Sequence, residues 1–332
     1  MTKKSDQFQR MLLIIIVVYS IFVSIKNPGF LQIQTLFDIV KTSSTTMIVA
    51  IGLLVVMISG GIDVSFMAIA LFGSYTSLFI MIQTGINSLI VAFVISTSIG
   101  ICLGLFNALL INWLKLPPFI ITLGTQNLFH GIMTTFIGDK SFGSGVLPSS
   151  LQEFGRGTLL QVTTENGTTG LTVSIIPVLI AALLTYLLLR KTMIGRGIVA
   201  IGNSEESARR AGFNPIKIRL FVYAFSGALA GMMGIVYAAQ VNALYPNKMV
   251  GDELMVVAAV VIGGAKITGG QGKIFGTILG VLIIYLLNST LILIGLSSSW
   301  NNLFVGAILV FAVAITSYQE RMKNRKNLIF TE

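Results

Sequence analysis

Long apolar runs alternate with short polar segments along almost the whole chain, and many approach the roughly 20 residues that a helix needs to cross a membrane. Runs with the strict alternation of a membrane-spanning strand are absent, which argues against a transmembrane barrel. The pattern therefore predicts an all-α, polytopic membrane protein with about ten transmembrane helices. We place these helices at residues 11–25, 45–59, 66–82, 86–114, 118–137, 171–189, 220–240, 254–264, 274–294 and 302–317.

Two of the predicted helices, 45–59 and 254–264, are short and run into glycine pairs. Short segments interrupted by glycine are typical of broken or re-entrant helices that line a transport pathway. The stretches 55–73 and 259–280 also echo each other, because each combines an apolar run, a glycine pair and a helix of small residues. This echo fits an internal duplication, and it fits equally the repeated composition of membrane helices.

Composition places the whole chain, residues 1–332, in a single membrane domain. The chain is 54% hydrophobic and 10% charged, and a soluble domain this apolar would lack the polar groups to cover its surface. Basic loops on the inner side of a membrane account for the net charge of +10, so we expect the lipid bilayer and no nucleic acid as a partner. The one cysteine, Cys102, excludes an intramolecular disulfide framework.

The distribution of basic residues predicts that both termini are cytosolic. With both ends inside, cytosolic segments hold 17 of the 22 basic residues: Lys3, Lys4, Arg10, Lys115, seven within 190–219, Lys266, Lys273, Arg321, Lys323, Arg325 and Lys326. The exterior keeps five, at Lys26, Lys41, Lys140, Arg156 and Lys248. The opposite orientation would invert this ratio and violate the positive-inside rule. The exterior loop 138–170 is then too long for a simple connector, so we expect it to be functional or mobile.

Groups for catalysis are scarce. The chain has one histidine, His130, and neither the spacing of a zinc site nor a Walker sequence. We therefore expect no metal, no cofactor and no ATPase site in this chain, which indicates a transport subunit rather than an enzyme. Carriers driven by protons or sodium usually bury carboxylates near the middle of the membrane. Here the acidic residues fall near predicted interfaces, tails and loops.

The polar loop 190–219 is the most informative segment, because it holds seven basic residues between two apolar helices. Residues 206–212 have the pattern of a short amphipathic helix that ends at Gly212 and Pro215. A structured cytosolic loop in a membrane protein usually contacts a soluble partner.

Four motifs in one order give the chain a resemblance to a known family. They are residues 60–65 (GGIDVS), 116–125 (LPPFIITLGT), 195–213 (GRGIVAIGNSEESARRAGF) and 250–280 (VGDELMVVAAVVIGGAKITGGQGKIFGTILG). From about residue 35 to 315 the chain resembles the permease subunits of bacterial ATP-binding-cassette (ABC) importers for monosaccharides, in the branched-chain-permease superfamily.

The resemblance implies which subunits and which segment of this chain would take part in transport. A separate ABC ATPase would hydrolyse ATP and receive a coupling helix from the 190–219 loop, with Glu206, Ser207, Ala208, Arg209 and Gly212 at the family's spacing. An extracytoplasmic sugar-binding protein would deliver the sugar, and a second permease chain, identical or not, would complete the pathway in the bacterial cytoplasmic membrane. The chain departs from related permeases at Met255, where many carry Asp, and at His130, where many carry Arg.

Polar residues of the predicted helices are the candidates for the substrate path. They are Asp63, Ser65, Asn107, Thr122, Thr125, Gln126 and Asn127. Their side chains can donate or accept hydrogen bonds as sugar hydroxyls require, and they serve equally well in helix–helix hydrogen bonds. Two other functions remain open: a stand-alone secondary sugar carrier and, with fewer catalytic groups to support it, an intramembrane enzyme.

Overall fold

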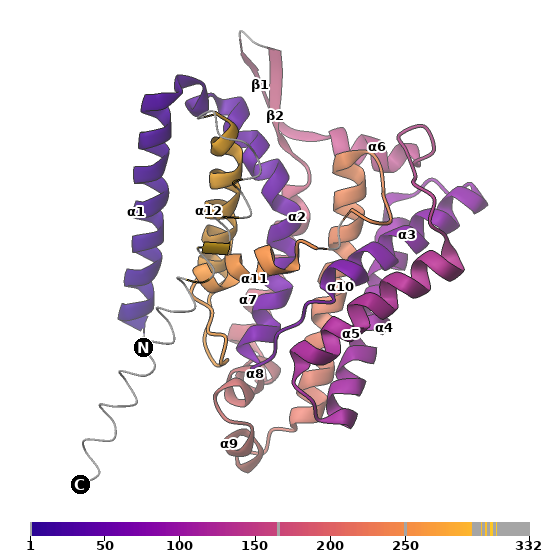
Figure 1. Ribbon diagram of the computed structural model, residues 1–332, viewed down its shortest axis with the longest axis vertical. Coiled ribbons are helices and arrows are strands. Elements are labelled where there is room, and N and C mark those ends of the chain that lie inside the picture. The colour runs from indigo at the N-terminus through magenta and orange to yellow at the C-terminus, as the bar shows by residue number, and fades with distance from the viewer. Residues whose placement is uncertain are drawn as a thin grey trace.

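Helices run between two ends of the molecule, and a β-hairpin projects from one end (Figure 1). The structure, a computed structural model, describes residues 2–164, 167–248 and 251–293, with residues 300, 303, 306, 307 and 310. In chain order the elements are α1 (Thr2–Lys26), the 3-10 turn η1 (Pro28–Leu31), α2 (Ile33–Ile58), α3 (Phe66–Thr84), α4 (Leu89–Leu114), α5 (Pro118–Ile132), the π-helical turn η2 (Met133–Ile137), α6 (Ser149–Arg156), β1 (Thr158–Thr164), β2 (Gly167–Thr172), α7 (Ile175–Lys191), α8 (Met193–Asn203), α9 (Glu205–Arg210), α10 (Pro215–Val241), α11 (Glu253–Ile262) and α12 (Ile274–Leu293).

Nine of the ten predicted helices appear among the described residues, and the tenth, 302–317, lies largely outside them. Within the described part of the chain, six helices are long and apolar enough to cross a membrane. The count is seven if α7 and α8, which meet at a bend of 78°, form one span. Two predicted spans are shorter than this test requires. The α-helix of α5 ends at Ile132, where a π-helical turn continues it, and α11 has only 10 residues.

The predicted start of the second helix was wrong. The prediction began at residue 45, whereas α2 begins at Ile33 and has 26 residues. Polar residues such as Asp38 and Thr42, both exposed, fill its first turns. These turns lack the apolar pattern that marks a membrane segment, yet they continue the same helix. Of the two helices that were predicted to be short, only α11 is short.

The all-α prediction also needs a correction, because β1 and β2 form an antiparallel hairpin within the exterior loop 138–170 and just beyond it. Gln161 pairs with Gly170, and Thr163 pairs with Thr168. The strands are rich in threonine, whose branched side chain favours extended backbone. Because they have only 7 and 6 residues and little apolar alternation, they gave no membrane-strand signal.

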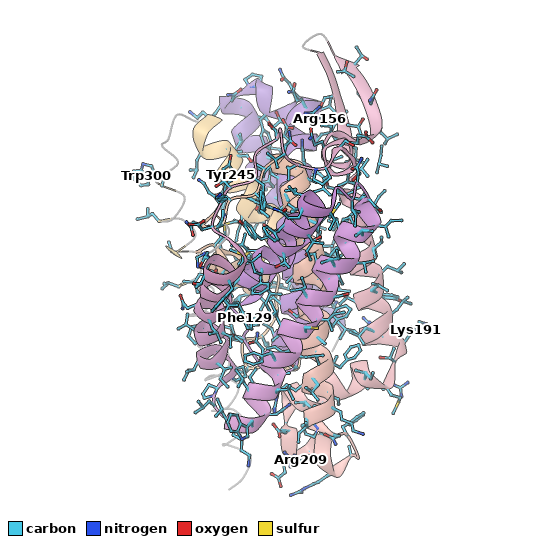
Figure 2. All side chains as sticks on the ribbon, turned by 90° about the vertical axis from the view of Figure 1, so that its right-hand side faces the viewer. Phe129, Arg156, Lys191, Arg209, Tyr245 and Trp300 are labelled. Carbon is cyan, nitrogen blue, oxygen red and sulfur yellow. The ribbon has the colours of Figure 1, made fainter. Side chains whose placement is uncertain are left out.

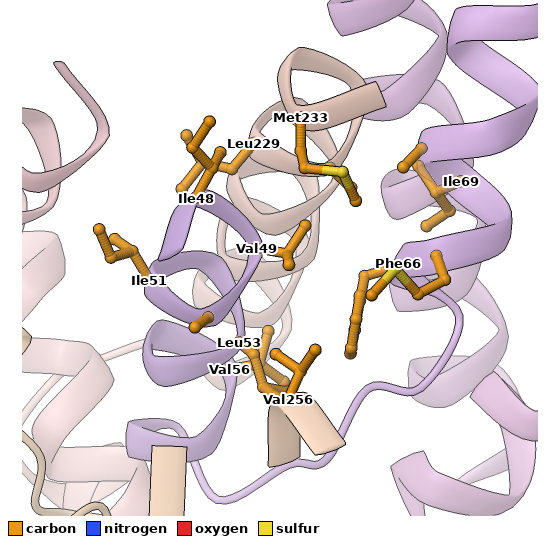
Figure 3. Packing of buried hydrophobic residues seen from close by; sticks show 14 of the residues in the cluster. Ile48, Val49, Ile51, Leu53, Val56, Phe66, Ile69, Leu229, Met233 and Val256 are labelled. Carbon is orange, nitrogen blue, oxygen red and sulfur yellow. The ribbon is translucent and has the colours of Figure 1, made fainter. Parts of the chain in front are cut away.

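The apolar core lies around α2. In the most apolar stretch of this helix, 83% of the residues are buried. Figure 3 shows its side chains, among them Val49 and Val56, packed toward α3, α10 and α11. By contrast, only 11% of the residues in the most apolar stretch of α1 are buried, and this helix stands at one side of the molecule (Figure 1). Apolar side chains on the outside of such a protein face lipid or another chain.

Glycines bring α4 and α10 into close contact. A Cβ atom at Gly100 would lie 2.1 Å from the carbonyl oxygen of Gly227, and one at Gly104 would lie 2.2 Å from that of Tyr223. Ser96 adds a hydrogen bond of 2.7 Å to the carbonyl oxygen of Gly231. Small residues permit this approach of two membrane helices, so the pair forms a rigid unit beside α2.

The two glycine-pair breaks share one geometry. After α2, the backbone N–H groups of Ser59, Gly60 and Gly61 bond to carbonyls of the last turn, and Gly60 has φ +88°. After α11, residues 263–265 repeat the same three bonds, and Gly264 has φ +90°. A left-handed glycine that closes the last turn in this way is a common helix stop. The echo in the sequence therefore corresponds to a repeated local structure.

Basic loops gather at one end of the molecule. The 190–219 loop and the 263–273 loop meet there, through a 2.9 Å hydrogen bond from Gly270 N–H to the end of α2 and close contacts with Gly202. The first turns of α1 lie beside them, because a Cβ at Gly264 would touch the ring of Phe8. The hairpin and α6 lie at the opposite end (Figure 1). The arrangement agrees with the side assigned to these loops from their charge.

Candidate functional site

The 190–219 loop is a series of capped helices rather than an irregular connection. The Thr192 hydroxyl accepts a hydrogen bond from Gly195 N–H at the start of α8, and the Ser204 hydroxyl accepts one from Ser207 N–H at the start of α9. The Asn214 side chain caps α10 in the same way. Each cap satisfies a backbone N–H that the helix leaves unpaired. The loop therefore keeps a defined shape at the end of the molecule (Figure 2).

Helix α9 is the short amphipathic helix that the sequence predicted, and it extends over Glu205–Arg210. It ends where predicted, because Gly212 has φ +85° and Phe213 N–H bonds to the carbonyl of Ala208 at 3.0 Å. The side chain of Ala208 is 1% exposed, so it faces the inside of the loop. A positive φ strains any residue that has a Cβ atom, which explains why residue 212 is glycine.

Helix α9 carries two ion pairs on its surface. Arg209 and Arg210 form ion pairs with the glutamates one turn earlier, and their side chains remain 61% and 78% exposed. Exposed pairs of this kind stabilise a helix by only a few tenths of a kcal/mol, so they leave the charges available to a partner. Figure 2 places Arg209 at the tip of the molecule.

Glu205 ties α9 to the membrane helices. Its carboxylate accepts hydrogen bonds from Arg209 at 2.8 Å and from Arg219 at 3.0 Å, and Arg219 also donates to the Asn112 side chain at 2.6 Å. The hydrogen bond from Arg209 and the nearby charge of Arg219 hold the pKa of Glu205 below its ordinary value. The Glu205–Arg219–Asn112 link thereby joins α9 to α10 and α4.

A second link joins the loop to both helix breaks, at a contact that we call the glycine joint (Gly60, Gly202, Gly269 and Gly270). A Cβ at Gly202 would lie 1.8 Å from the carbonyl oxygen of Ile58 and 2.6 Å from Gly270 N. A Cβ at Gly269 would lie 2.8 Å from Gly60 Cα. Three backbone segments thus touch with no side chain between them. A displacement of α8 must move the ends of α2 and of the 263–273 loop with it, because close-packed backbone cannot absorb it.

The break between α2 and α3 holds a buried polar cluster. Asn107 donates to the Ser65 hydroxyl at 2.7 Å, and Ser65 donates to the Asp63 carboxylate through its hydroxyl at 2.7 Å and its backbone N–H at 2.8 Å. Thr122 accepts a hydrogen bond from Val64 N–H at 3.2 Å. None of these four side chains is more than 1% exposed. Four of the seven candidate path residues therefore come together, as Asp63, Ser65, Asn107 and Thr122.

The other three candidates lie further along α5 and do not join the cluster. Gln126 donates to the Glu253 carboxylate at 2.7 Å, which ties α5 to the start of α11. Thr125 donates to the carbonyl of Thr122 at 3.3 Å, and Asn127 is exposed and donates to Leu123 of its own helix. In this conformation Thr125 and Asn127 are hydrogen-bonded only within α5, whereas Gln126 forms a helix–helix hydrogen bond.

Sequence reasoning missed the residues that hold the loop in place: Glu205, Arg219, Asn112 and Gly202. The glutamate and arginine pairs four residues apart within 205–210 are a visible signal for α9. The contacts of Arg219 and Gly202 join segments far apart in the chain, and a single sequence carries no local sign of them. His130 is half-buried and hydrogen-bonded to the carbonyl of Pro246 at 2.9 Å. Within the described residues, no three His, Cys, Asp or Glu side chains gather as a metal site would require.

Comparisons with known proteins cover most of the chain. Residues 35–313 match the family described as branched-chain amino acid transport system / permease component. The chain is 32% identical over 321 residues to an autoinducer 2 import system permease protein of Salmonella typhi, covering 95% of this chain and 87% of that protein. It is 33% identical over 296 residues to the ribose import permease protein of Bacillus subtilis strain 168, with coverages of 89% and 88%. No solved structure matches the chain significantly.

Proposed function

Because the chain belongs to the family of branched-chain amino acid transport system permease components, we propose that it is the membrane-spanning subunit of an ATP-driven importer of a monosaccharide. The permeases for autoinducer 2 and ribose, each about one third identical over most of both chains, support a small hydroxylated substrate. A permease is a transport component, and the ATPase is a separate subunit. These relatives give no support to a stand-alone carrier.

The observation that carries the proposal is the ordered 190–219 loop. ATP hydrolysis by a separate subunit can move this chain only through a rigid contact at the cytosolic end. Helix α9 offers exposed arginines to such a partner, while Glu205 and the glycine joint connect it to α10, α4 and both helix breaks. We therefore assign ATPase docking to α9, with Glu206, Ser207, Arg209 and Arg210 toward the partner and Ala208 and Gly212 maintaining the fold of the loop.

Ten spans with both termini in the cytosol remain the proposed topology. The chain would pass from the loop end to the hairpin end and back in the order α1, α2, α3, α4, α5, α7, α10, α11 and α12, with the short α11 and the 263–273 loop together completing one crossing before α12 returns. A final span at 302–317 would return the C-terminus to the cytosol. The single membrane domain, 1–332, would then lie in the bacterial cytoplasmic membrane.

We propose two further partners: a sugar-binding protein on the exterior surface, and a second permease chain beside this one in the membrane. The exterior surface for a sugar-binding protein is formed by α6, the hairpin and residues 242–248, which the paired backbone of Phe142 and Leu244 holds together. A second permease chain, identical or not, would cover part of the apolar surface of the spans. The Asp63, Ser65, Asn107 and Thr122 cluster would border the path when the helix breaks open.

The proposal is tested by uptake and co-purification with the charge on α9 reversed. We expect the tagged chain to purify with an ATPase from its native host and to take up a monosaccharide only when ATP is supplied. The double variant Arg209→Glu and Arg210→Glu should lose the ATPase and the uptake. Lys191→Glu, a charge reversal at an exposed residue away from the α9 tip (Figure 2), should keep both. Uptake that ignores ATP and follows the proton gradient would contradict the proposal.

A further inference from the structure

The corner between α7 and α8, which we call the elbow (residues 188–196), is tightly packed. The two helices meet at a bend of 78°, so α8 leaves α7 at nearly a right angle. The Thr192 hydroxyl bridges the corner, because it donates to the carbonyl of Leu188 at 2.7 Å and accepts from Gly195 N–H at 3.0 Å. A Cβ at Gly195 would lie 2.1 Å from the carbonyl oxygen of Leu188. The elbow therefore holds the end of α7 and the start of α8 in fixed positions.

An apolar stripe on α7 leads to the elbow. Leu183, Leu187 and Arg190 follow one another at spacings of four and three residues, so they lie on one face of the helix. All three are exposed, and Tyr186, one turn before Arg190, is exposed beside them. Figure 2 places Lys191, the last residue of α7, at the outer edge of the molecule. Exposed leucines of a membrane span face acyl chains, and a tyrosine near its end lies at the level of the headgroups. The stripe therefore brings Arg190 to headgroup level.

A second arginine lies across the elbow. Arg196 belongs to the first turn of α8, and it is exposed together with Met193 and Val199, at spacings of three residues along the same face. Exposed apolar side chains beside a basic one, on a helix nearly perpendicular to a span, are typical of a helix that lies in the membrane interface. Arg190 and Arg196 thus flank the elbow, each within one helical turn of it.

The chain itself does not neutralise these two arginines. No acidic residue occurs in the sequence between residues 166 and 204. Every ion pair in the described part of the chain uses a glutamate of α9, and none involves Arg190 or Arg196. Their guanidinium groups suit a phosphate group, because the planar fork of N–H donors can form two parallel hydrogen bonds to phosphate oxygens. The elbow therefore combines an apolar stripe with two cations that match a phosphate.

We propose that the elbow binds an anionic phospholipid, with the phosphate between Arg190 and Arg196 and the acyl chains along the stripe of Leu183 and Leu187. One headgroup would then join the end of α7 to the start of α8. Because α8 carries Gly202 of the glycine joint and leads directly into α9, the lipid would hold the 190–219 loop against the membrane surface. Lys191 is rotated by about 100° from Arg190 around the helix and is not part of the site.

Contact quenching by a brominated lipid tests the site without ATP or sugar. In a Cys102→Ser background, Leu187→Cys carries a fluorescent thiol label on the stripe, and Val94→Cys carries the same label at an exposed position of α4. The full-length chain is placed in nanodiscs of neutral lipid, into which brominated phosphatidylglycerol or brominated phosphatidylcholine is titrated. At residue 187 we expect phosphatidylglycerol to associate roughly tenfold or more strongly than phosphatidylcholine, and at residue 94 we expect no preference. Equal association of the two lipids at residue 187 would overturn the proposal.

Single substitutions test whether both arginines hold the lipid. With the label at residue 187, Arg190→Gln and Arg196→Gln should each lower the preference for phosphatidylglycerol roughly fivefold, because each removes one cation from the membrane surface. Lys191→Gln is the matched control, since it removes an adjacent exposed cation outside the site and should leave the preference unchanged.

Two results with these variants would refute the site. An equal loss of preference in Lys191→Gln would mean that the lipid follows the general basic charge of this end of the chain. If Arg196→Gln kept the lipid preference and instead lost the ATPase on co-purification, α8 would face the ATPase rather than the membrane. The lipid measurement needs no transport, so a failure of ATP-dependent uptake by the unaltered chain would refute the proposed function and leave the elbow site to be decided by quenching.

Discussion

Replacement of Gly202 by alanine is expected to uncouple the 190–219 loop from the membrane helices. The added Cβ would lie 1.8 Å from the carbonyl oxygen of Ile58, whereas an ordinary contact begins at 3.4 Å, so the two backbones must separate by about 1.6 Å. The carbonyl oxygen of Ile58 is a backbone atom and the new Cβ is bonded directly to the backbone, so no flexible side chain can move aside to relieve the clash. Overpacking of this kind costs about 1–3 kcal/mol.

The loss of transport should exceed the loss of stability, because the clash lies where α8 contacts the end of α2. We expect Gly202→Ala to insert and to bind the ATPase, with a thermal midpoint lowered by a few degrees. ATP hydrolysis should continue while sugar uptake in proteoliposomes falls at least tenfold. Gly124→Ala is the control, because a Cβ at Gly124 meets nothing within 4 Å. Uptake by Gly202→Ala equal to that of Gly124→Ala would refute the role of the joint.

Three further predictions concern α9 and the helix break. Ala208→Phe should displace α9, since the side chain it replaces is 1% exposed; we expect normal insertion, a small change in melting temperature and loss of uptake. Asp63→Ala should leave the hydroxyl and N–H of Ser65 unsatisfied at about 1–3 kcal/mol each, which denaturant titration of the purified chain would measure. The lowered pKa of Glu205 means that its pairing with Arg209 and Arg219 stabilises α9 above about pH 4 and is lost below it. The hydrogen-exchange protection factors of α9, which are corrected for the intrinsic pH dependence of amide exchange, should therefore be equal at pH 5 and pH 7, and Glu205→Gln should lower them at both.

Much of the fold was predictable from the sequence, because membrane helices have a strong apolar signal. The positions of nine helices, the short α11 and the helix in the 190–219 loop are confirmed. The first turns of α2 and the hairpin were missed, since polar helix turns and threonine-rich strands resemble loops in a hydropathy pattern. The number of spans stays a prediction beyond the six or seven that the described residues give.

The candidate site was less predictable, because its parts meet only in three dimensions. Gly212 was predicted from the local helix pattern and Ala208 from the spacing of the related family, and both have the burial or backbone conformation that a capped helix requires. Arg219 reaches Asn112 across 107 positions of the chain, and no local pattern signals such a contact. The family resemblance is confirmed by the match over residues 35–313, and it carried the functional prediction further than the residues alone.

The most direct test of the account is a cross-link from α9 to the ATPase. In a Cys102→Ser background, Arg210→Cys places a thiol on the exposed face of α9, and Lys191→Cys supplies a control. With a bifunctional thiol reagent that has a reducible disulfide in its spacer, the account predicts that Arg210→Cys is joined to an ATP-binding subunit. Transport should stop and then return after the spacer is reduced. A cross-link that forms only from Lys191→Cys, or uninterrupted uptake with Arg210→Cys joined to the ATPase, would contradict α9 as the coupling helix.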